Sequence, residues 1–467
     1  MNIGLINPNK EIKEPAIHLG LGYIASYANK RDKSLKFTLL DTRIASKKEN
    51  NSFFSSDFDL IGITSSSQVY SEALEIAGKI KETKPNIPLV IGGPHASTVK
   101  EEVLERSPFD YAVFGEGEET FFDLISYLRG KTAINSINGL IYKTFDGKIL
   151  INPAREVISD IDCIPFPAYQ LFQIERYPQH RLITSRGCPY NCVFCNSRSI
   201  WTRRWRKRSA ENIFKEVNLL ISEYSHKSFV FNDDSFNLDL GRVEKICDYF
   251  INNKTGIIWS ASIRADKVTS LIASKMKKSG CYNVSIGIES ANNHILEMMQ
   301  KKITINQIYA GIQILRNAGL DVMGQFMIGN PGDTLETIKE SIDFAKNSNL
   351  TGVEFYTALP YKDSLLFEYV KKSGKMLTDK PVYEYHRIEP RIVFETPEFN
   401  YEERLEAVSL AKQNGYYHAL STDHRSIVLD IGKNAAKMVQ QILGPALGNK
   451  IYLLYRKIYQ IFFVKKK

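Results

Sequence analysis

The chain has 467 residues, of which 43% are hydrophobic and 24% charged, and its formal net charge is +9. This length exceeds what one hydrophobic core supports, so two or three domains are expected. Six cysteines in such a length exclude a disulfide-stapled secreted fold, and the N-terminus lacks the basic start and long apolar stretch of a signal peptide. We therefore expect a cytoplasmic protein.

The first part of the chain alternates short apolar runs with helix-length segments. This pattern predicts an α/β domain with a doubly wound parallel sheet, flavodoxin-like or Rossmann-like, over residues 1–135. The predicted strands are 3–6, 37–40, 60–64, 89–91 and 111–114, and the predicted helices are 17–29, 69–81, 97–106 and 118–128.

Small and polar residues follow three of these strands, where such sheets bind their ligands. Glycines there let a large ligand approach the backbone closely, although any one of them can equally be a plain turn residue. His95 is isolated in the sequence, so a hydrogen-bonded structural histidine is the alternative to a ligand contact. The candidate ligand-binding residues are Ser65, Ser66, Gly92, Gly93, His95, Gly115 and Glu116.

Residues 136–180 are predicted to form a hairpin and a linker. Two apolar runs flank the turn Phe145-Asp146-Gly147, and Pro165 and Pro167 interrupt regular structure after them. From 181 to 365 the βα pattern returns as six units, which predicts a (β/α)6 partial barrel with its chemistry at the carboxyl ends of the strands. The predicted strands are 182–184, 228–232, 257–262, 283–288, 321–328 and 352–357.

Three cysteines, Cys188, Cys192 and Cys195, occupy eight residues after the first of these strands. Three thiolates on one loop can ligate three irons of a [4Fe–4S] cluster and leave the fourth iron open. Buried thiols and a structural zinc site are the alternatives, but residues 196–208 contain no Cys or His that would complete a zinc site.

With Phe194 before its last cysteine, this run resembles the CxxxCxΦC signature of radical S-adenosylmethionine (radical SAM) enzymes. The resemblance implies that SAM binds the open iron, that reductive cleavage of SAM releases a 5′-deoxyadenosyl radical, and that Phe194 lies against adenine. It further implies an electron donor such as flavodoxin or ferredoxin.

The resemblance also implies SAM contacts at the strand ends. Asp233 and Asp234 stand where the family binds the methionyl amine, Glu289 and Ser290 where it contacts the ribose, and Gly329 in the glycine element beside adenine. The acids at 233 and 234 can instead cap an exposed turn. Arg264 can pair with the carboxylate of the ligand or, structurally, with Asp266.

Residues 1–130 resemble the cobalamin-binding domain that precedes many radical SAM cores, through pieces such as Leu19–Ala25 and Ile91–His95. The loop after the first strand lacks the DxHxxG motif whose histidine coordinates cobalt. Either cobalamin is held without a protein histidine, or the domain has the fold and no cobalamin.

Residues 366–467 are predicted to be mostly helical, with helices at 401–417 and 427–443. The aromatic tail 451–464 precedes three lysines; it can lie on an anionic membrane surface or pack on the barrel. A second basic run, 203–208, contains Trp205 and can bind nucleic acid, but a solvated loop or a counter-charge for anionic cofactor groups is favoured, so no nucleic-acid partner is expected.

Together these features predict a cobalamin-dependent radical SAM enzyme, a C-methyltransferase that acts on an unactivated carbon of a small-molecule or lipid substrate. The alternatives are a cobalamin-assisted cyclase or oxidoreductase without methyl transfer, and a non-catalytic cobalamin or iron–sulfur sensor. The sequence does not identify the substrate.

Overall fold

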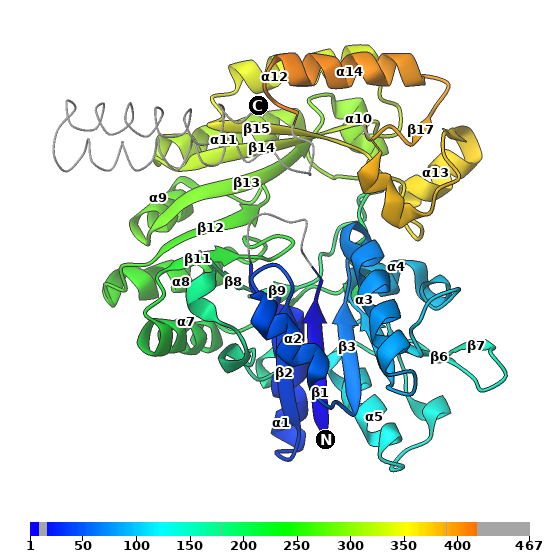
Figure 1. Ribbon diagram of the computed structural model, residues 1–467. Coiled ribbons are helices and arrows are strands. Elements are labelled where there is room, and N and C mark those ends of the chain that lie inside the picture. Colours follow the sequence, from blue (N-terminus) through cyan, green and yellow to red (C-terminus); the bar gives the residue numbers. More distant parts are fainter. Residues whose placement is uncertain (9–15, 178, 389, 418–467) are drawn as a thin grey trace. The chain divides into compact units, whose positions relative to one another are not determined.

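The computed structural model describes residues 1–8, 16–177, 179–388 and 390–417. The chain divides into two compact units, Met1–Tyr417 and His418–Lys467. The second unit lies outside the described residues, and with it the predicted helix 427–443 and the basic aromatic tail. The first unit is built on two large β-sheets, one from the N-terminal part of the chain and one from the middle part (Figure 1).

The N-terminal sheet has seven strands in the order β2-β1-β3-β4-β5-β6-β7. The first five are parallel, which confirms the predicted doubly wound domain, and the predicted hairpin adds β6 and β7 as antiparallel strands. From β1 the chain adds β2 on one side and then β3 to β5 on the other, so the strand order reverses between β1 and β3. In such sheets ligands bind beyond the carboxyl ends of the strands at this point. The strands are β1 (Asn2–Asn7), β2 (Lys36–Asp41), β3 (Leu60–Thr64), β4 (Leu89–Gly92), β5 (Tyr111–Val113), β6 (Leu140–Lys143) and β7 (Ile149–Ile151).

Helices cover both faces of this sheet. On one face Leu21 of α1 and Leu124 of α5 pack against strand residues such as Leu5; on the other, α2, α3 and α4 pack through residues such as Phe53 and Ala73. The helices are α1 (Leu19–Arg31), α2 (Lys47–Ser55), α3 (Tyr70–Thr83), α4 (Pro94–Val99) and α5 (Glu118–Leu128).

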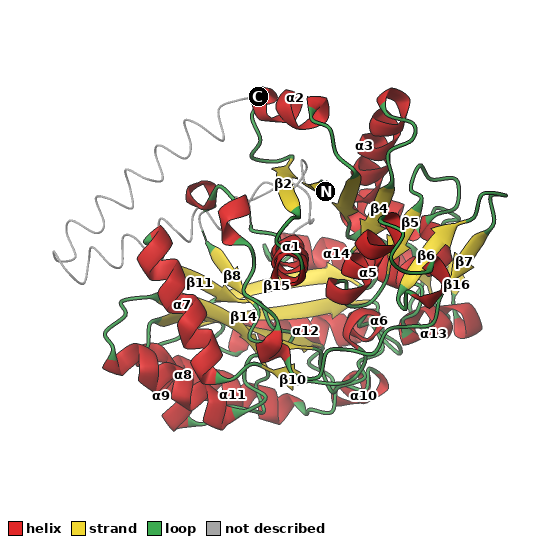
Figure 2. Cartoon of the chain, turned by 90° about the horizontal axis from the view of Figure 1, so that it is seen from below, coloured by secondary structure: helices red, strands yellow, loops and turns green. Residues whose placement is uncertain are grey.

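The second sheet has six parallel strands in the order β15-β14-β13-β12-β11-β8, which confirms the predicted (β/α)6 core. Helices α7, α8, α9 and α11 follow the outer side of the curved sheet (Figure 2), and buried aromatic residues such as Phe231 and Trp259 fill the space beneath them. The elements are β8 (His180–Leu182), α7 (Ala210–Tyr224), β11 (Ser228–Phe231), α8 (Leu240–Asn252), β12 (Ile258–Ile263), α9 (Ser270–Lys278), β13 (Cys281–Glu289), α11 (Ile305–Asn317), β14 (Asp321–Ile328), α12 (Leu335–Asn347) and β15 (Gly352–Thr357).

Short elements complete the unit. Several are connections that periodicity does not reveal, and α14 packs against α12 and β14 beside the edge strand β15 (Figure 1). They are β9 (Ser185–Arg186), α6 (Ser197–Trp201), β10 (Arg206–Lys207), α10 (Asn293–Met298), α13 (Leu365–Ser373), β16 (Lys375–Met376), β17 (Phe394–Glu395), α14 (Tyr401–Gln413) and the 3-10 turns η1 (Ser67–Val69), η2 (Lys100–Val103), η3 (Ile134–Ser136), η4 (Ile161–Cys163), η5 (Tyr169–Leu171), η6 (Ile174–Arg176) and η7 (Val382–Arg387).

Some predicted boundaries are wrong. The helix predicted at 97–106 begins at Pro94 and continues after Val99 only as the turn η2, because Pro is favoured in a first helical turn. The strand predicted at 182–184 ends at Leu182; the backbone N–H of Thr184 donates to the buried carboxylate of Asp233. The helix predicted at 401–417 ends at Gln413.

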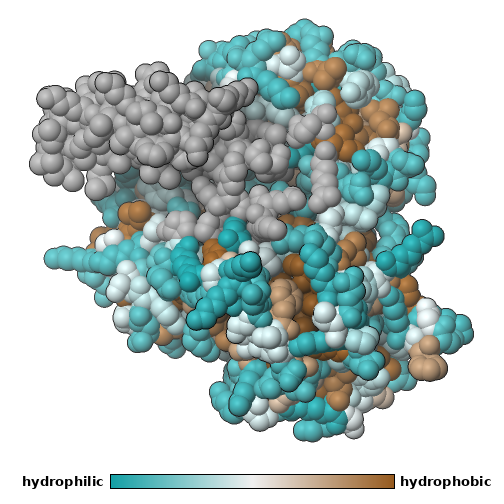
Figure 3. Space-filling model, viewed as in Figure 1, coloured by the Kyte–Doolittle hydropathy of each residue, from teal (hydrophilic) through white to brown (hydrophobic). Residues whose placement is uncertain are grey.

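Within the described part of the chain, no helix has the length and apolar content needed to cross a bilayer. The face of the molecule in Figure 3 is mostly hydrophilic and carries scattered hydrophobic residues.

Candidate active site

The three cysteines lie on the loop that follows β9, as the sequence predicts. The loop begins at Gly187, whose φ is +83° and at which an added Cβ would overlap the carbonyl oxygen of Arg204. Val193 anchors its middle: its N–H donates to the carbonyl of Met299, and its carbonyl accepts from the N–H of Leu366. The loop is therefore held between the end of α10 and the first turn of α13.

All three thiols are partly exposed and lie near one another. Burial raises the pKa of each, that of Cys195 to about 12, so metal binding here must release protons. Among the described residues no three His, Cys, Asp or Glu side chains are grouped around one point that could hold a metal ion. This spacing does not conflict with a [4Fe–4S] cluster, in which each thiolate binds a different iron.

The two acids at the end of β11 have different surroundings. Asp233 is buried and saturated: its carboxylate accepts from the N–H of Thr184 (2.6 Å), from the hydroxyl of Ser185 (2.8 Å) and from the hydroxyl of Thr184. Asp234 has an accessible carboxylate that accepts from the hydroxyl of Ser197 (2.5 Å). Desolvation by the surrounding protein raises the pKa of Asp234, which lies near Cys188 and Cys195.

Arg264 takes the structural alternative. Its Nε donates to Asp266 (2.9 Å), and its guanidinium lies over the ring of Tyr190, a residue of the cysteine loop (3.8 Å). The side chain thus ties the end of β12 to the loop.

Glu289 ends β13 at φ +67°, beside an irregularity in the pairing of β13 with β14. Its carboxylate pairs with Lys301 Nζ at 2.9 Å, and both side chains are almost fully buried. Lys301 also lies 5.9 Å from the ring of Phe194, and both charges act on Cys192. Sequence reasoning missed Lys301, because a lysine in a turn between helices carries no periodic or motif signal.

Ser290 follows Glu289 at the end of β13, and Gly329 follows β14. Ser290 is buried and its hydroxyl accepts from the N–H of Asn292. Gly329 has φ +98°, and its N–H donates to the carboxylate of Asp333 (3.0 Å), which also accepts from the N–H of Asn330 (2.7 Å). Burial raises the pKa of Asp333 to about 6. The carboxylate therefore fixes the glycine loop rather than facing solvent.

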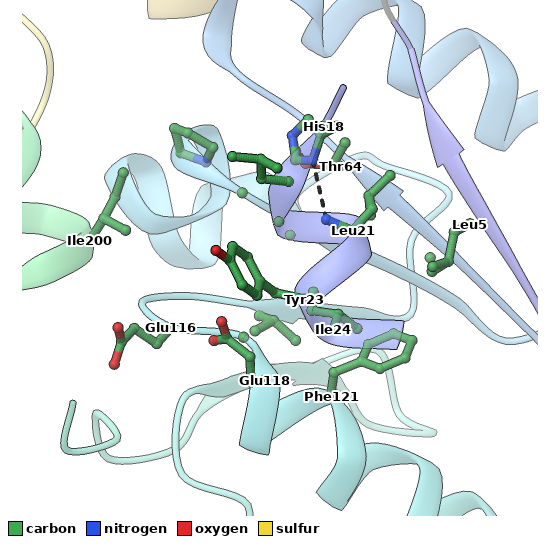
Figure 4. Close-up of a pocket in the computed structure, with 18 of the residues that line it drawn as sticks. Leu5, His18, Leu21, Tyr23, Ile24, Thr64, Glu116, Glu118, Phe121 and Ile200 are labelled. Carbon is green, nitrogen blue, oxygen red and sulfur yellow. Dashed lines mark hydrogen bonds between the residues drawn. The ribbon is translucent and has the colours of Figure 1, made fainter. Parts of the chain in front are cut away.

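A cavity of about 320 Å³ lies at the carboxyl ends of β1, β3, β4 and β5. Its floor is apolar, and on one side its wall includes residues of the second sheet and the cysteine region. In the view of Figure 4, Tyr23, Glu116 and Glu118 lie toward Ile200, and Leu5 and Phe121 lie on the opposite side. The wall residues from the second sheet and the cysteine region are Arg181, Ile183, Arg186, Ile200, Trp201 and Asn232.

Four of the predicted ligand residues line this cavity: Gly92, Gly93, Gly115 and Glu116. An added Cβ at Gly92 or Gly115 would meet no protein atom closer than 3.9 Å, so the space beside these two glycines is open to a ligand. Glycine walls over an apolar floor let a flat apolar group approach the backbone closely.

Ser65, Ser66 and His95 are not part of the cavity wall. His95 is buried behind it: its Nδ1 is hydrogen-bonded to the hydroxyl of Ser67 (3.0 Å), and its ring packs on Tyr70 with 4.1 Å between centroids. Burial lowers the pKa of His95 to about 3. The structural alternative for this histidine is therefore the one found.

His18 is the histidine in the described cavity wall. Its Nδ1 accepts from the N–H of Leu21 (3.3 Å), which caps α1, and its Nε2 lies 3.1 Å from the hydroxyl of Thr64. Burial lowers its pKa to about 4. Both ring nitrogens are thus engaged with protein groups, and the ring offers no free lone pair to a metal.

Comparison with known proteins identifies a family for the N-terminal sheet domain and for the six-stranded core. The Radical SAM superfamily model matches residues 182–345, and the B12 binding domain model matches residues 9–125.

An uncharacterized methyltransferase of Pyrococcus horikoshii is 36% identical over 69% of this chain and 71% of that protein. The anaerobic magnesium-protoporphyrin IX monomethyl ester cyclase of Rubrivivax gelatinosus is 28% identical over 65% of this chain and 57% of its own length. A radical SAM methyltransferase from Kitasatospora setae, solved with tryptophan and a SAM analogue, superposes with a TM-score of 0.69 at 19% identity, over 81% of this chain and 79% of that one; this last likeness concerns the fold.

Proposed function

Because this chain belongs to the radical SAM superfamily, in the branch with an N-terminal B12-binding domain, we propose that it is a cobalamin-dependent C-methyltransferase acting on an unactivated carbon. One observation carries the proposal. The cavity at the strand ends of the N-terminal sheet has part of its wall from the residues that flank the cysteine loop. A cofactor in the cavity and one at the cysteines would therefore face a common substrate, and such placement is the main contribution of a cofactor enzyme.

The cofactors of the reaction are a [4Fe–4S] cluster, SAM and cobalamin. When bound, the cluster and SAM supply a hydrogen-abstracting 5′-deoxyadenosyl radical, and methylcobalamin supplies the methyl group. We assign the cluster to Cys188, Cys192 and Cys195, and the face of Phe194 to adenine. The chain's own task is to orient these groups and to exclude water from the space between them.

The geometry refines the SAM contacts within this proposal. Asp234 keeps an accessible carboxylate near two of the cysteines, so we assign the methionyl amine to Asp234 and a scaffolding role to Asp233. Gly329 presents backbone at the end of β14, which supports adenine recognition there. Glu289 and Arg264 act through the cysteine loop in this assignment, as the partners of Lys301 and Tyr190, and Ser290 remains our candidate for the ribose.

In the N-terminal domain we assign cobalamin to the cavity, with Gly92, Gly93, Gly115 and Glu116 as its wall. The engaged ring of His18 supports binding without a protein imidazole on cobalt. In this assignment Ser65, Ser66 and His95 support the strand ends from behind.

Anaerobic reconstitution tests the function without knowledge of the substrate. The reduced protein with cobalamin and SAM is expected to release 5′-deoxyadenosine and, separately, to form S-adenosylhomocysteine together with methylcobalamin. A matched Cys195→Ala variant should lose the first product. Release of deoxyadenosine with no methylation of cobalamin would reject methyl transfer and favour a cyclase or oxidoreductase, the activity that the Rubrivivax relative's name states.

Reductive cleavage of SAM requires an electron donor, and we propose a small-molecule substrate for this chain. For this chain we propose flavodoxin or ferredoxin as the donor. A lipid substrate and a membrane contact through the basic tail are extensions of the same proposal, and that tail lies outside the described residues. Turnover with reduced flavodoxin, compared with a chemical reductant, tests the donor directly.

A further inference from the structure

Four buried charges join the N-terminal sheet to the start of the cysteine loop. Glu116 and Glu118 follow β5, Arg186 ends β9 and Arg206 begins β10. Arg186 Nη1 lies 2.9 Å from Glu116 and its Nη2 lies 2.5 Å from Glu118; Arg206 Nη1 lies 2.9 Å from Glu116. All four side chains are at most 7% exposed. We call these four residues the Arg186 ion cluster.

The position of the Arg186 ion cluster connects the two cofactor regions. Glu116, Glu118 and Arg186 all line the cavity, and Arg186 stands two residues before Cys188 in the chain. Its guanidinium also lies over the ring of Tyr23 on α1, 5.1 Å from the centroid, and over the ring of Trp201 on α6, 5.3 Å from the centroid. One side chain thus contacts the wall of the cavity and fixes the backbone from which the cysteine loop departs.

The chemistry of the contact favours a geometric role. Two planar Arg–carboxylate contacts of one guanidinium fix both distance and angle. Buried ion pairs add little net stability compared with apolar residues of the same volume, although removing one partner alone is costly. A well-packed apolar junction would serve stability alone at least as well. Four paired charges at this junction specify orientation.

We infer that Arg186 is a positioning residue that, through Glu116 and Glu118, holds the cysteine loop at a fixed distance from the cofactor cavity. The inference rests on the proposed function for the identity of the two cofactors. Arg186 itself takes no part in bond making.

The test is the magnetic interaction between Co(II) in cobalamin and the reduced [4Fe–4S] cluster, measured by electron paramagnetic resonance. It depends on the separation of the two centres and needs no substrate. The test variant replaces a whole ion pair with apolar residues, Arg186→Met with Glu118→Met. The matched control replaces the equally buried pair within the barrel, Arg208→Met with Glu216→Met; that pair is at most 5% exposed and is not part of the cavity wall.

The expected result is loss or broadening of the cobalt–cluster interaction in the 186/118 variant, with both cofactors bound, and a wild-type interaction in the control. An unchanged interaction in the 186/118 variant overturns the inference, as does an equal loss in the control. Arg186→Lys provides a second reading if the double variant does not fold: Lys keeps the charge but lacks the two guanidinium nitrogens that bridge Glu116 and Glu118, so it should also broaden the interaction.

Failure of the proposed function is visible separately, in wild-type protein that binds no cobalamin. In that case hydrogen exchange decides the positioning role. Amides of residues 115–118 and 187–195 should lose protection together in the 186/118 variant and keep it in the control. Retained protection in the 186/118 variant overturns the inference.

Discussion

At the scale of single residues, this chain buries histidines in two different ways. His18 and His95 are hydrogen-bonded to Thr64 and Ser67 and support the cavity. His180, at the start of β8, is fully buried, and neither of its ring nitrogens has a hydrogen-bond partner within the described residues. Its ring packs on His226, with 3.8 Å between centroids. Burial, with the neighbouring His226, lowers the pKa of His180 to about 3.

This lowered pKa predicts acid sensitivity. The unfolded chain binds a proton at His180 below about pH 6.5 whereas the folded chain does not, so the stability contribution is complete above pH 6.5 and is lost as the pH falls toward 3. Between pH 7.5 and 5 the loss is about 2 kcal/mol from this residue. His180→Phe should remove that part of the slope and be neutral or stabilising at pH 7.5, because an apolar ring replaces unpaired nitrogens.

Urea unfolding across this pH range measures the effect. His294→Gln, at an exposed position on α10, is the control and should leave the wild-type slope in place. An unaltered slope in His180→Phe would contradict the assignment of the acid sensitivity to this site.

At the scale of secondary-structure elements, two helical glycines show whether close packing or helix propensity decides the effect of a Gly→Ala substitution on stability. Gly311 faces the barrel from the middle of α11, and an added Cβ there would overlap the carbonyl oxygen of Ala265, in the loop after β12. Gly78 in α3 has no atom within 4 Å of an added Cβ. Gly311→Ala should lower the free energy of unfolding by about 1–3 kcal/mol, and Gly78→Ala should raise it by about 0.5–1 kcal/mol.

Thermal unfolding followed by circular dichroism distinguishes the two cases. Equal stabilisation by both substitutions would show that α11 can move away from the loop after β12 at little cost.

The difference between local sequence signals and tertiary packing also explains how far the sequence predicts this fold. Apolar periodicity located the strands of both sheets. Central strands such as β3 are buried on both faces and read as continuous apolar runs, and strands such as β14 alternate buried and partly exposed residues. Periodicity missed α2 and α10, which are short and carry few buried residues. Their ends are defined by side-chain caps such as Ser46 and Asn292 rather than by an apolar stripe.

The candidate site was predictable only where a motif carries the chemistry. Cys188, Cys192 and Cys195 could be named because their spacing is local. Lys301, Arg186 and the division of labour between Asp233 and Asp234 depend on partners far away in the sequence, such as Glu289, Glu116 and Thr184. Spacing along the chain does not encode which of two adjacent acids turns inward.

At the scale of the whole molecule, the cavity couples ligand binding to the stability of both sheets. A ligand that binds only the folded state raises the free energy of unfolding, by about 2.7 kcal/mol at one hundred times its Kd. The two sheets share the cavity wall and lie in one compact unit. Cobalamin bound at the N-terminal sheet should therefore also stabilise the barrel.

Tryptophan fluorescence reports on the second sheet and the cavity wall, because Trp259 lies in β12, Trp201 lines the cavity, and none of the three tryptophans of the chain lies in the N-terminal sheet. Cobalamin is expected to move the midpoint of the tryptophan transition and of the circular dichroism transition by the same amount. Gly92→Leu should cancel both shifts, since its side chain would enter the open space beside β4, while the unfolding of the cofactor-free protein stays within about 0.5 kcal/mol of wild type. Gly92→Ala is the matched smaller change and should keep part of the shift. A circular dichroism transition that moves with cobalamin while the tryptophan transition stays in place would show that the sheets unfold separately, and the Arg186 ion cluster would then join two independently stable parts.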